Sequence, residues 1–288
     1  MKTRLRPATL LVLLTPLTLA ACTTGEPGST ASQSPWVRQK QKPQTPEAHL
    51  DLAEEAMAAG PGWKFQVRGV EKLTLRGRQN EAIYSGVLER TQNPMALHGL
   101  GTVTTGAGAG QRTHGEELFV LDDTGYLNSE RSGEWKEAPA TDPEMANKVE
   151  DPVAALADFR GYMQRATGVD VTLMKSAYGN QITLKADVTS RKLGGVRDRP
   201  WAAKAQREVE PTLDRLREAG IRVSHAQLTL VRLEEELVLD SATHRVLTHW
   251  FRFTVRMPYG SDDITYTQEV KETNRGEFKE RIEGPDAA

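Results

Sequence analysis

Residues 247–257 read Leu-Thr-His-Trp-Phe-Arg-Phe-Thr-Val-Arg-Met, and this stretch is the most informative one about the fold class. Apolar and polar side chains alternate along it. Because successive side chains of a β-strand point to opposite faces, the alternation predicts a strand with one buried face. That face holds Leu247, His249, Phe251, Phe253, Val255 and Met257. Strands of this length and regularity are typical of a broad, curved antiparallel sheet with one apolar face.

The segments around this strand extend the same sheet. Residues 231–239 alternate in the same way and reach the strand through a turn at 240–243, and residues 264–270 follow after a Pro-Tyr-Gly turn. A hairpin is expected over residues 169–188, where the turn pair Gly179-Asn180 separates two alternating runs. Short turns between consecutive strands predict antiparallel neighbours.

The first half of the chain shows the same period. Strands are expected at residues 65–75, 83–87, 97–104, 117–122 and 126–129. Turn signals separate them, at Gly77-Arg78, Asn93-Pro94, Asp123-Thr124-Gly125 and Ser132-Gly133. The glycine-rich stretch 99–110 has no Gly-Lys-Ser/Thr after it, so it is not a phosphate-binding loop. We expect a flexible hairpin loop there, with a mobile flap over a cavity as the alternative.

Three segments have the spacing of amphipathic helices. They cover residues 46–59, 152–163 and 200–219. Thr45 and Asp151 fit as N-caps because a proline follows each of them at the first helical position. Pro211 is a potential break in the third helix. The apolar face of the sheet needs a cover, so we expect an α+β fold in which the central helices pack on that face.

The N-terminus predicts export. Three basic residues precede an apolar run at 8–21, which is too short to span a membrane and is typical of a cleaved signal. Leu19-Ala20-Ala21-Cys22 resembles the lipobox of bacterial lipoproteins. That resemblance implies cleavage between Ala21 and Cys22 and diacylglycerol on the Cys22 sulfur. An ordinary signal peptide with a chance cysteine is the alternative.

The expected organisation is a signal peptide at 1–21, a lipidated cysteine and flexible tether at 22–44, and one domain at 45–288. The tether is rich in Thr, Ser, Gln, Gly and Pro, a composition that buries too little surface to fold. Without the three basic residues of the signal, 34 Lys and Arg face 39 Asp and Glu, a net charge of −5. We therefore expect no nucleic-acid partner. The sequence after the signal contains no second hydrophobic segment, so we expect no membrane span there.

The sequence contains no recognisable motif for catalysis or for metal or cofactor binding. The six histidines show no metal-ligand spacing, the chain lacks Gly-x-Ser-x-Gly, and Cys22 is the only cysteine. We expect no enzyme activity, no metal and no cofactor. His249 lies beside Phe251 as a core histidine with one hydrogen bond or as a titrating group in a cavity. Glu235 is expected at an exposed sheet edge or paired with an arginine of a neighbouring strand.

Two segments resemble the LolA/LppX-like superfamily of envelope lipoproteins. One is residues 118–126 (Leu-Phe-Val-Leu-Asp-Asp-Thr-Gly-Tyr) with Gly133-Glu134-Trp135, and the other is residues 237–244 (Leu-Val-Leu-Asp-Ser-Ala-Thr-His). The resemblance covers residues 46–283 and its motifs are structural. It implies an incomplete antiparallel barrel with helices packed on its concave face. It also implies a protein that carries or senses lipid acyl chains, or a regulator that binds other envelope proteins.

The candidate cavity lining consists of large apolar side chains on the expected inner face and on the helices. These are Phe65, Val67, Phe119, Phe159, Met163, Phe251, Phe253 and Met257. Packing in a filled core is the alternative for each of them, because open and filled half-barrels share the same alternation.

Two functions are consistent with the sequence. The first is a membrane-anchored protein that binds a lipid or another hydrophobic small molecule in a half-barrel cavity. The second is a non-enzymatic regulatory or structural protein that contacts another envelope protein. Both place the domain at the cell membrane, lipid-anchored on the extracytoplasmic face.

Overall fold

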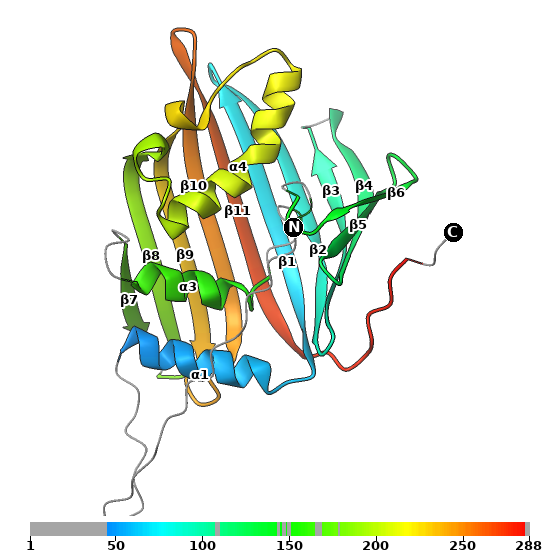
Figure 1. Ribbon diagram of the computed structural model, residues 1–288, viewed down its shortest axis with the longest axis vertical. Helices are drawn as coiled ribbons and strands as arrows, with labels where there is room; N and C mark the ends of the chain where they lie inside the picture. The colour runs from blue at the N-terminus through cyan, green and yellow to red at the C-terminus, as the bar shows by residue number, and fades with distance from the viewer. Residues whose placement is uncertain are drawn as a thin grey trace, which may run out of the picture. The chain divides into compact units, whose positions relative to one another are not determined.

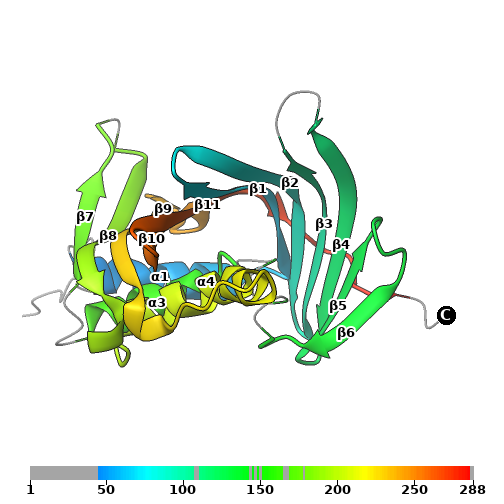
Figure 2. The same cartoon turned by 90° about the horizontal axis from the view of Figure 1, so that it is seen from above.

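β10 (Val246–Tyr259) contains the alternating stretch 247–257 and lies within one large antiparallel sheet. The structure is a computed structural model that describes residues 45–106, 110–142, 145, 148, 151–164, 169–177 and 179–285. In these residues, eleven strands pair in the order β6-β5-β4-β3-β2-β1-β11-β10-β9-β8-β7. The sheet is curved and does not close (Figure 2). The predicted fold class, a curved antiparallel sheet with helices on its concave face, is confirmed.

The sheet consists of two meanders. The first comprises β1 (Gly62–Leu75), β2 (Arg78–Gln92), β3 (Met95–Thr105), β4 (Arg112–Leu121), β5 (Thr124–Ser129) and β6 (Trp135–Pro139). The second comprises β7 (Asp170–Lys175), β8 (Gln181–Lys192), β9 (Thr229–Asp240), β10 and β11 (Asp262–Glu277). The two join where the first and last strands pair, with Gly69 opposite Val270. Strands far apart in sequence therefore form the centre of the sheet.

Three described α-helices lie side by side on the concave face of the second meander (Figures 1 and 2). They are α1 (Pro46–Ala58), α3 (Ala155–Met163) and α4 (Pro200–Glu218). Short 3-10 turns, η2 (Leu193–Gly195) and η3 (His225–Gln227), flank the α4 segment. No helix in the described residues has the length and apolar character needed to cross a bilayer.

The core lies between these helices and the sheet. Phe251, Phe253, Val255 and Met257 of β10 are at most 1% exposed, as the alternation predicted. Residues of the helices, including Leu50, Met57, Phe159, Trp201 and Val209, cover them and are equally buried. A smaller cluster on the outer face unites Phe119 of β4 with the C-terminal residues Phe278 and Ile282.

The helix predictions hold with two adjustments. The Thr45 side chain accepts a hydrogen bond from the Ala48 N–H at 3.2 Å, so the predicted cap of α1 is confirmed. The prediction of Asp151 as the N-cap of α3 is wrong, because residues 152–154 form a turn and the helix begins at Ala155 with Ala154 as its N-cap. An Asp151 carboxylate oxygen accepts from the Val153 N–H at 2.9 Å within this turn. α4 continues through Pro211, whose nitrogen has no N–H to donate to the preceding turn of the helix.

Two strand predictions need correction. β6 was not anticipated, although its first residue, Trp135, belongs to the recognised Gly-x-Trp segment. Gly99 and Gly101 lie inside β3, paired with Leu88 and Gly86, and are not part of a hairpin loop. Position 101 of this strand requires glycine because the Tyr84 ring occupies the space that a Cβ would need.

Candidate functional site

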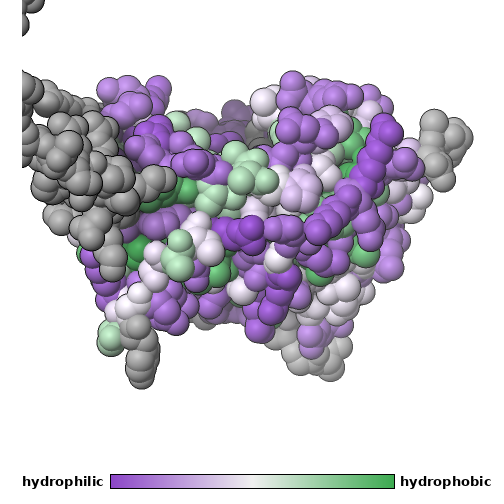
Figure 3. Space-filling view, turned by 90° about the horizontal axis from the view of Figure 1, so that it is seen from below, coloured by the Kyte–Doolittle hydropathy of each residue, from purple (hydrophilic) through white to green (hydrophobic). Residues whose placement is uncertain are grey.

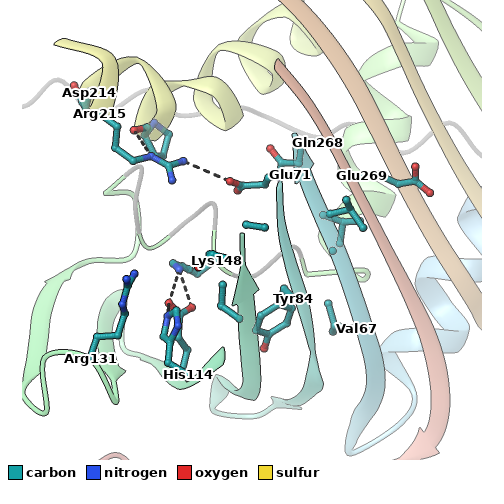
Figure 4. A pocket seen from close by; sticks show the side chains of 18 of the residues that line it. Val67, Glu71, Tyr84, His114, Arg131, Lys148, Asp214, Arg215, Gln268 and Glu269 are labelled. Atoms are coloured by element: carbon teal, nitrogen blue, oxygen red, sulfur yellow. Dashed lines mark hydrogen bonds and ion pairs between the residues drawn. The ribbon is translucent and has the colours of Figure 1, made fainter. Parts of the chain in front are cut away.

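The concave face of the sheet has a covered half and an open half. The helices cover β7–β11, whereas β1–β4 face a cavity of about 750 Å³ that α4 closes on one side (Figure 4). The cavity residues on α4 are Pro211, Asp214, Arg215, Arg217 and Glu218. The cavity is partly open to solvent and is the candidate site.

The cavity floor is a row of residues that strand pairing brings side by side. Gly69 of β1 pairs with Tyr84 of β2, Tyr84 with Val103 of β3, and Val103 with His114 of β4. All four line the cavity, and Val67 lies one step along β1 on the same face. Since side chains of paired residues lie on the same face, the floor follows directly from the register.

Tyr84 shapes this floor because two glycines make room for its ring. A Cβ on Gly86 would lie 2.5 Å from the Tyr84 hydroxyl oxygen, and one on Gly101 would lie 2.7 Å from its ring carbon Cζ. The phenol therefore lies close against the backbones of β2 and β3. Burial, with a smaller effect from the nearby Glu116 carboxylate, raises the pKa of Tyr84 to about 12. The floor thus carries a neutral hydroxyl at ordinary pH.

Charged side chains line the two sides of the cavity. On the α4 side, the Arg215 guanidinium donates to Glu71 at 3.4 Å and to the Thr212 hydroxyl at 3.0 Å. On the β4 side, the Lys148 ammonium contacts both Glu116 carboxylate oxygens, at 2.7 and 2.9 Å. Arg131 lies on this second side (Figure 4) and forms no ion pair with any described residue. The cavity therefore combines an apolar and aromatic floor with a charged rim.

The covered half contains a second group of polar residues, all of them inside the core. Glu235 of β9 is 0% exposed and accepts three hydrogen bonds. The donors are Tyr162 Oη at 2.6 Å, Lys204 Nζ at 2.9 Å and His249 Nε2 at 2.9 Å. His249 Nδ1 also lies 2.6 Å from Glu272 Oε2. We call Tyr162, Lys204, Glu235, His249 and Glu272 the buried network.

Electrostatics favours the ionised forms of Glu235 and His249 within the network. Burial alone would raise the pKa of Glu235, but Lys204, His249 and Tyr162 outweigh it and bring that pKa down. Burial would lower the pKa of His249, but Glu272 and Glu235 outweigh it and raise that pKa. The imidazole is therefore a cation between two carboxylates. No member is accessible to a substrate, because the exposure of these five residues is at most 2%.

A second polar contact attaches α4 to the sheet beside the cavity. Gln268 of β11 donates to the Glu208 carboxylate at 3.2 Å, and the Tyr266 hydroxyl donates to Gln268 at 3.2 Å. Glu208 is 1% exposed, and Gln268 also lines the cavity. This contact and the buried network together hold α4 in place as the wall of the cavity.

The candidate lining residues lie in different places. Val67 lines the cavity. Five others are buried in the core beneath the helices and do not line it: Phe65, Phe159, Phe251, Phe253 and Met257. Met163 packs partly buried against this core, and Phe119 lies in the outer-face cluster. Ala21 and Cys22 lie outside the described residues.

The partners of Glu235 and His249 differ from those expected from the sequence. Glu235 has neither an exposed edge position nor an arginine partner, because a lysine from α4 and a histidine from β10 reach it instead. His249 is a core histidine, as the first alternative proposed, but it has two carboxylate partners in place of one. The alternation along the strands predicts that Glu235 and His249 share a face of the sheet. It does not predict the contact with Lys204, because α4 is distant in sequence.

The comparisons with known proteins found no matching family model and no matching curated protein. Several solved structures are similar. LprF from Mycobacterium bovis matches with 14% identity and a TM-score of 0.28, over 78% of this chain and 92% of that one. A putative outer membrane lipoprotein-sorting protein domain from Vibrio parahaemolyticus matches with 8% identity and a TM-score of 0.31, over 80% and 91%.

A DUF1329 family protein from Desulfovibrio piger matches with 8% identity and a TM-score of 0.27, over 77% of this chain and 90% of that one. With identities and TM-scores this low, the function has to be argued from the geometry of the chain itself.

Proposed function

We propose that this chain is a membrane-anchored extracytoplasmic lipoprotein that holds a lipid or another largely hydrophobic molecule in the open half of its sheet. The observation that carries the proposal is the cavity of about 750 Å³ between α4 and β1–β4. Ligand sites usually measure roughly 300–1,000 Å³ and combine an apolar lining with a few polar groups. The valines and the neutral Tyr84 would contact the apolar part of the ligand, and the charged rim would face its polar part.

The anchor is the second element of the proposal. Cys22, preceded by Leu19-Ala20-Ala21, would carry the diacylglycerol, and residues 1–21 would be removed. Two acyl chains hold a protein on a bilayer, at about 0.8 kcal/mol for each buried CH₂ group, whereas one chain binds only marginally. The domain at 45–288 would then work at the membrane surface from which its ligand comes.

Photo-crosslinking in cells tests this function on the full chain. Bacteria that produce the chain are grown with a fatty acid that carries a diazirine and an alkyne, which enters their lipids. After irradiation, labelled peptides are identified by mass spectrometry. We expect label on peptides of β1–β3 that contain Val67, Tyr84 and Val103. The same sample reports lipidation, because the peptide that begins at Cys22 would carry the label without irradiation.

The control separates the cavity from the rest of the sheet. Val67→Phe fills part of the cavity and is expected to reduce the label severalfold. Arg68→Phe places the same bulk on the exposed opposite face and should leave the label unchanged. Equal labelling of the two variants, or label on Cys22 alone, would contradict the binding function.

The regulatory alternative has an observation of its own, the two edges of the sheet. β6 and β7 end the sheet in the described residues, and Met174 of β7 is 45% exposed. An unpaired edge offers backbone N–H and C=O groups to a strand of another protein. If the chain acts this way, a partner captured from envelope extracts is lost in Thr172→Pro and retained in Val67→Phe. The opposite pattern would favour the cavity.

A further inference from the structure

A second, smaller chamber adjoins the cavity and shares four lining residues with it. This second chamber has a volume of about 270 Å³, and its residues include Leu73, Asn80, Leu216 and Tyr266. It lies farther along the inner face of β1, on which Val67 and Gly69 belong to the main cavity and Leu73 to the second chamber. From Val67 to Leu73 the strand rises by about 20 Å. The combined space is therefore long, as an extended chain requires.

An ion pair stands where the two spaces meet. Glu71 and Arg215 line both of them, together with Ala82 and Thr105. The Arg215 guanidinium lies 3.4 Å from the Glu71 carboxylate and bridges from α4 to β1 across the passage (Figure 4). Glu71 belongs to the same inner face as Gly69 and Leu73 and lies between them along β1, where the two linings overlap.

Separating the Glu71–Arg215 ion pair requires little free energy. The Arg215 side chain is 63% exposed and that of Glu71 is 30% exposed, and ion pairs this accessible to water stabilise a fold very little. Arg215 also has two partners on its own helix, the Thr212 hydroxyl at 3.0 Å and the Pro211 carbonyl at 3.3 Å. These contacts hold the guanidinium on α4 when Glu71 moves away, so that the passage opens without any change in the helix.

We propose that the Glu71–Arg215 pair is a gate, and that the second chamber receives the end of an extended apolar chain longer than the main cavity holds. This inference rests on the proposed function and adds the class of ligand, a long single-chain amphiphile. Each methylene group moved from water into the chamber strengthens binding about fourfold. Two or three such groups outweigh the loss of an exposed ion pair, so a long chain opens the gate and a short one does not.

The test locates the end of the chain. Membranes that contain the full-length protein receive fatty acids of 10 or 16 carbons, each with a diazirine at the terminal carbon. After irradiation, peptide mapping shows which residues are labelled. We expect the 16-carbon probe to label residues around Leu73, Asn80 and Leu216, and the 10-carbon probe to label only the main cavity around Val67 and Val103.

Four variants sharpen the readout. Leu73→Phe fills the second chamber and is expected to reduce its labelling by the long probe about tenfold, because at least two methylene groups lose their place. Thr74→Phe puts the same bulk on the opposite face and should change nothing. Glu71→Gln removes the ion pair and should increase labelling of the second chamber. Asn80→Phe fills the same chamber from an exposed position, which covers the case in which Leu73→Phe does not fold.

The outcomes separate this inference from the function on which it rests. If neither probe labels β1–β3, the binding function itself fails. If both probes label the main cavity alone, binding stands and the gate is overturned. The gate is also overturned if the long probe labels the second chamber as strongly in Leu73→Phe and Asn80→Phe as in the wild type.

Discussion

Glu235 is a fully buried carboxylate whose cost is offset by three hydrogen-bond donors. Removing an ion from water costs several kcal/mol, and only close, complete pairing compensates for it. Tyr162 from α3, Lys204 from α4 and His249 from β10 all converge on this one group. A single side chain therefore connects two helices to the sheet, so its loss affects three elements at once.

Glu235→Gln tests this dependence. The substitution keeps the size of the side chain but leaves the Lys204 and His249 cations with less negative charge around them. We expect the free energy of unfolding to fall by about 3–5 kcal/mol, the usual effect of breaking a buried ion pair. Chemical denaturation measures it. Glu236→Gln, at the next position, is the matched control. The Glu236 side chain is 28% exposed, and its ion pair with Lys185 should contribute less than about 1 kcal/mol.

His249 makes stability depend on pH in the alkaline range. Its two carboxylates outweigh burial and raise its pKa from 6.5 to about 10. The protonated imidazole therefore stabilises the fold fully below pH 6.5, and this contribution is lost as the pH rises through 10. Denaturation between pH 7 and 9.5 should show a free energy of unfolding that falls by up to about 1.4 kcal/mol per pH unit.

The comparison with a histidine on the surface isolates this effect. His98→Gln, on the outer face, should retain the alkaline decline, whereas His249→Gln should remove it at the cost of lower stability throughout. A wild-type curve that stays flat from pH 7 to 9.5 would show that His249 is neutral in the folded protein.

At the level of elements, two neighbouring strands depend on glycines where Tyr84 crosses them. A Cβ on Gly86 would lie 2.6 Å from the Leu100 carbonyl oxygen and 2.8 Å from the Gly101 Cα. Because both are backbone atoms, no side-chain rotation relieves the contact. The strands β2 and β3 therefore need glycine here for steric reasons, in addition to the space that Tyr84 requires.

Gly86→Ala should lower the free energy of unfolding by about 1–3 kcal/mol through overpacking. It should also weaken ligand binding, because the ring of Tyr84 is forced into the cavity. Gly69→Ala is the control on the adjacent strand, where the nearest atom to a new Cβ is 3.5 Å away, an ordinary contact. Thermal unfolding of the two variants decides the question, and equal melting temperatures would refute the steric argument.

Helices and strands could be predicted from the sequence where the alternation or helical spacing extends over many residues. β10 and the caps of α1 follow from local alternation and turn chemistry, which act over a few residues. The cavity was not predictable in this way. Its floor depends on which strand pairs with which, and its wall depends on α4 covering one half of the sheet and not the other. Phe251 and Val67 share the same pattern in sequence, yet Phe251 belongs to the core alone, whereas Val67 belongs to the core and also lines the cavity.

At the scale of the whole molecule, the two halves of the sheet have different tasks. The second meander with its three helices supplies most of the core and fixes α4, and the first meander supplies the floor of the cavity. Changes in the buried network should therefore affect stability first and binding through it. Changes in the cavity lining of the open half should affect binding more than stability.

The proposed anchor predicts how the chain reaches the membrane. In Cys22→Ser the hydroxyl cannot form the thioether, so the lipid is not added and cleavage that depends on it does not follow. We expect the variant to retain residues 1–21, to incorporate no radiolabelled palmitate, and to migrate as a larger precursor. Thr23→Ser, one residue later, should be labelled and processed normally. An ordinary signal peptide would give a different result, with Cys22→Ser cleaved and released like the wild type and neither of them labelled. That pattern would remove the lipid anchor and leave a secreted binding domain in its place.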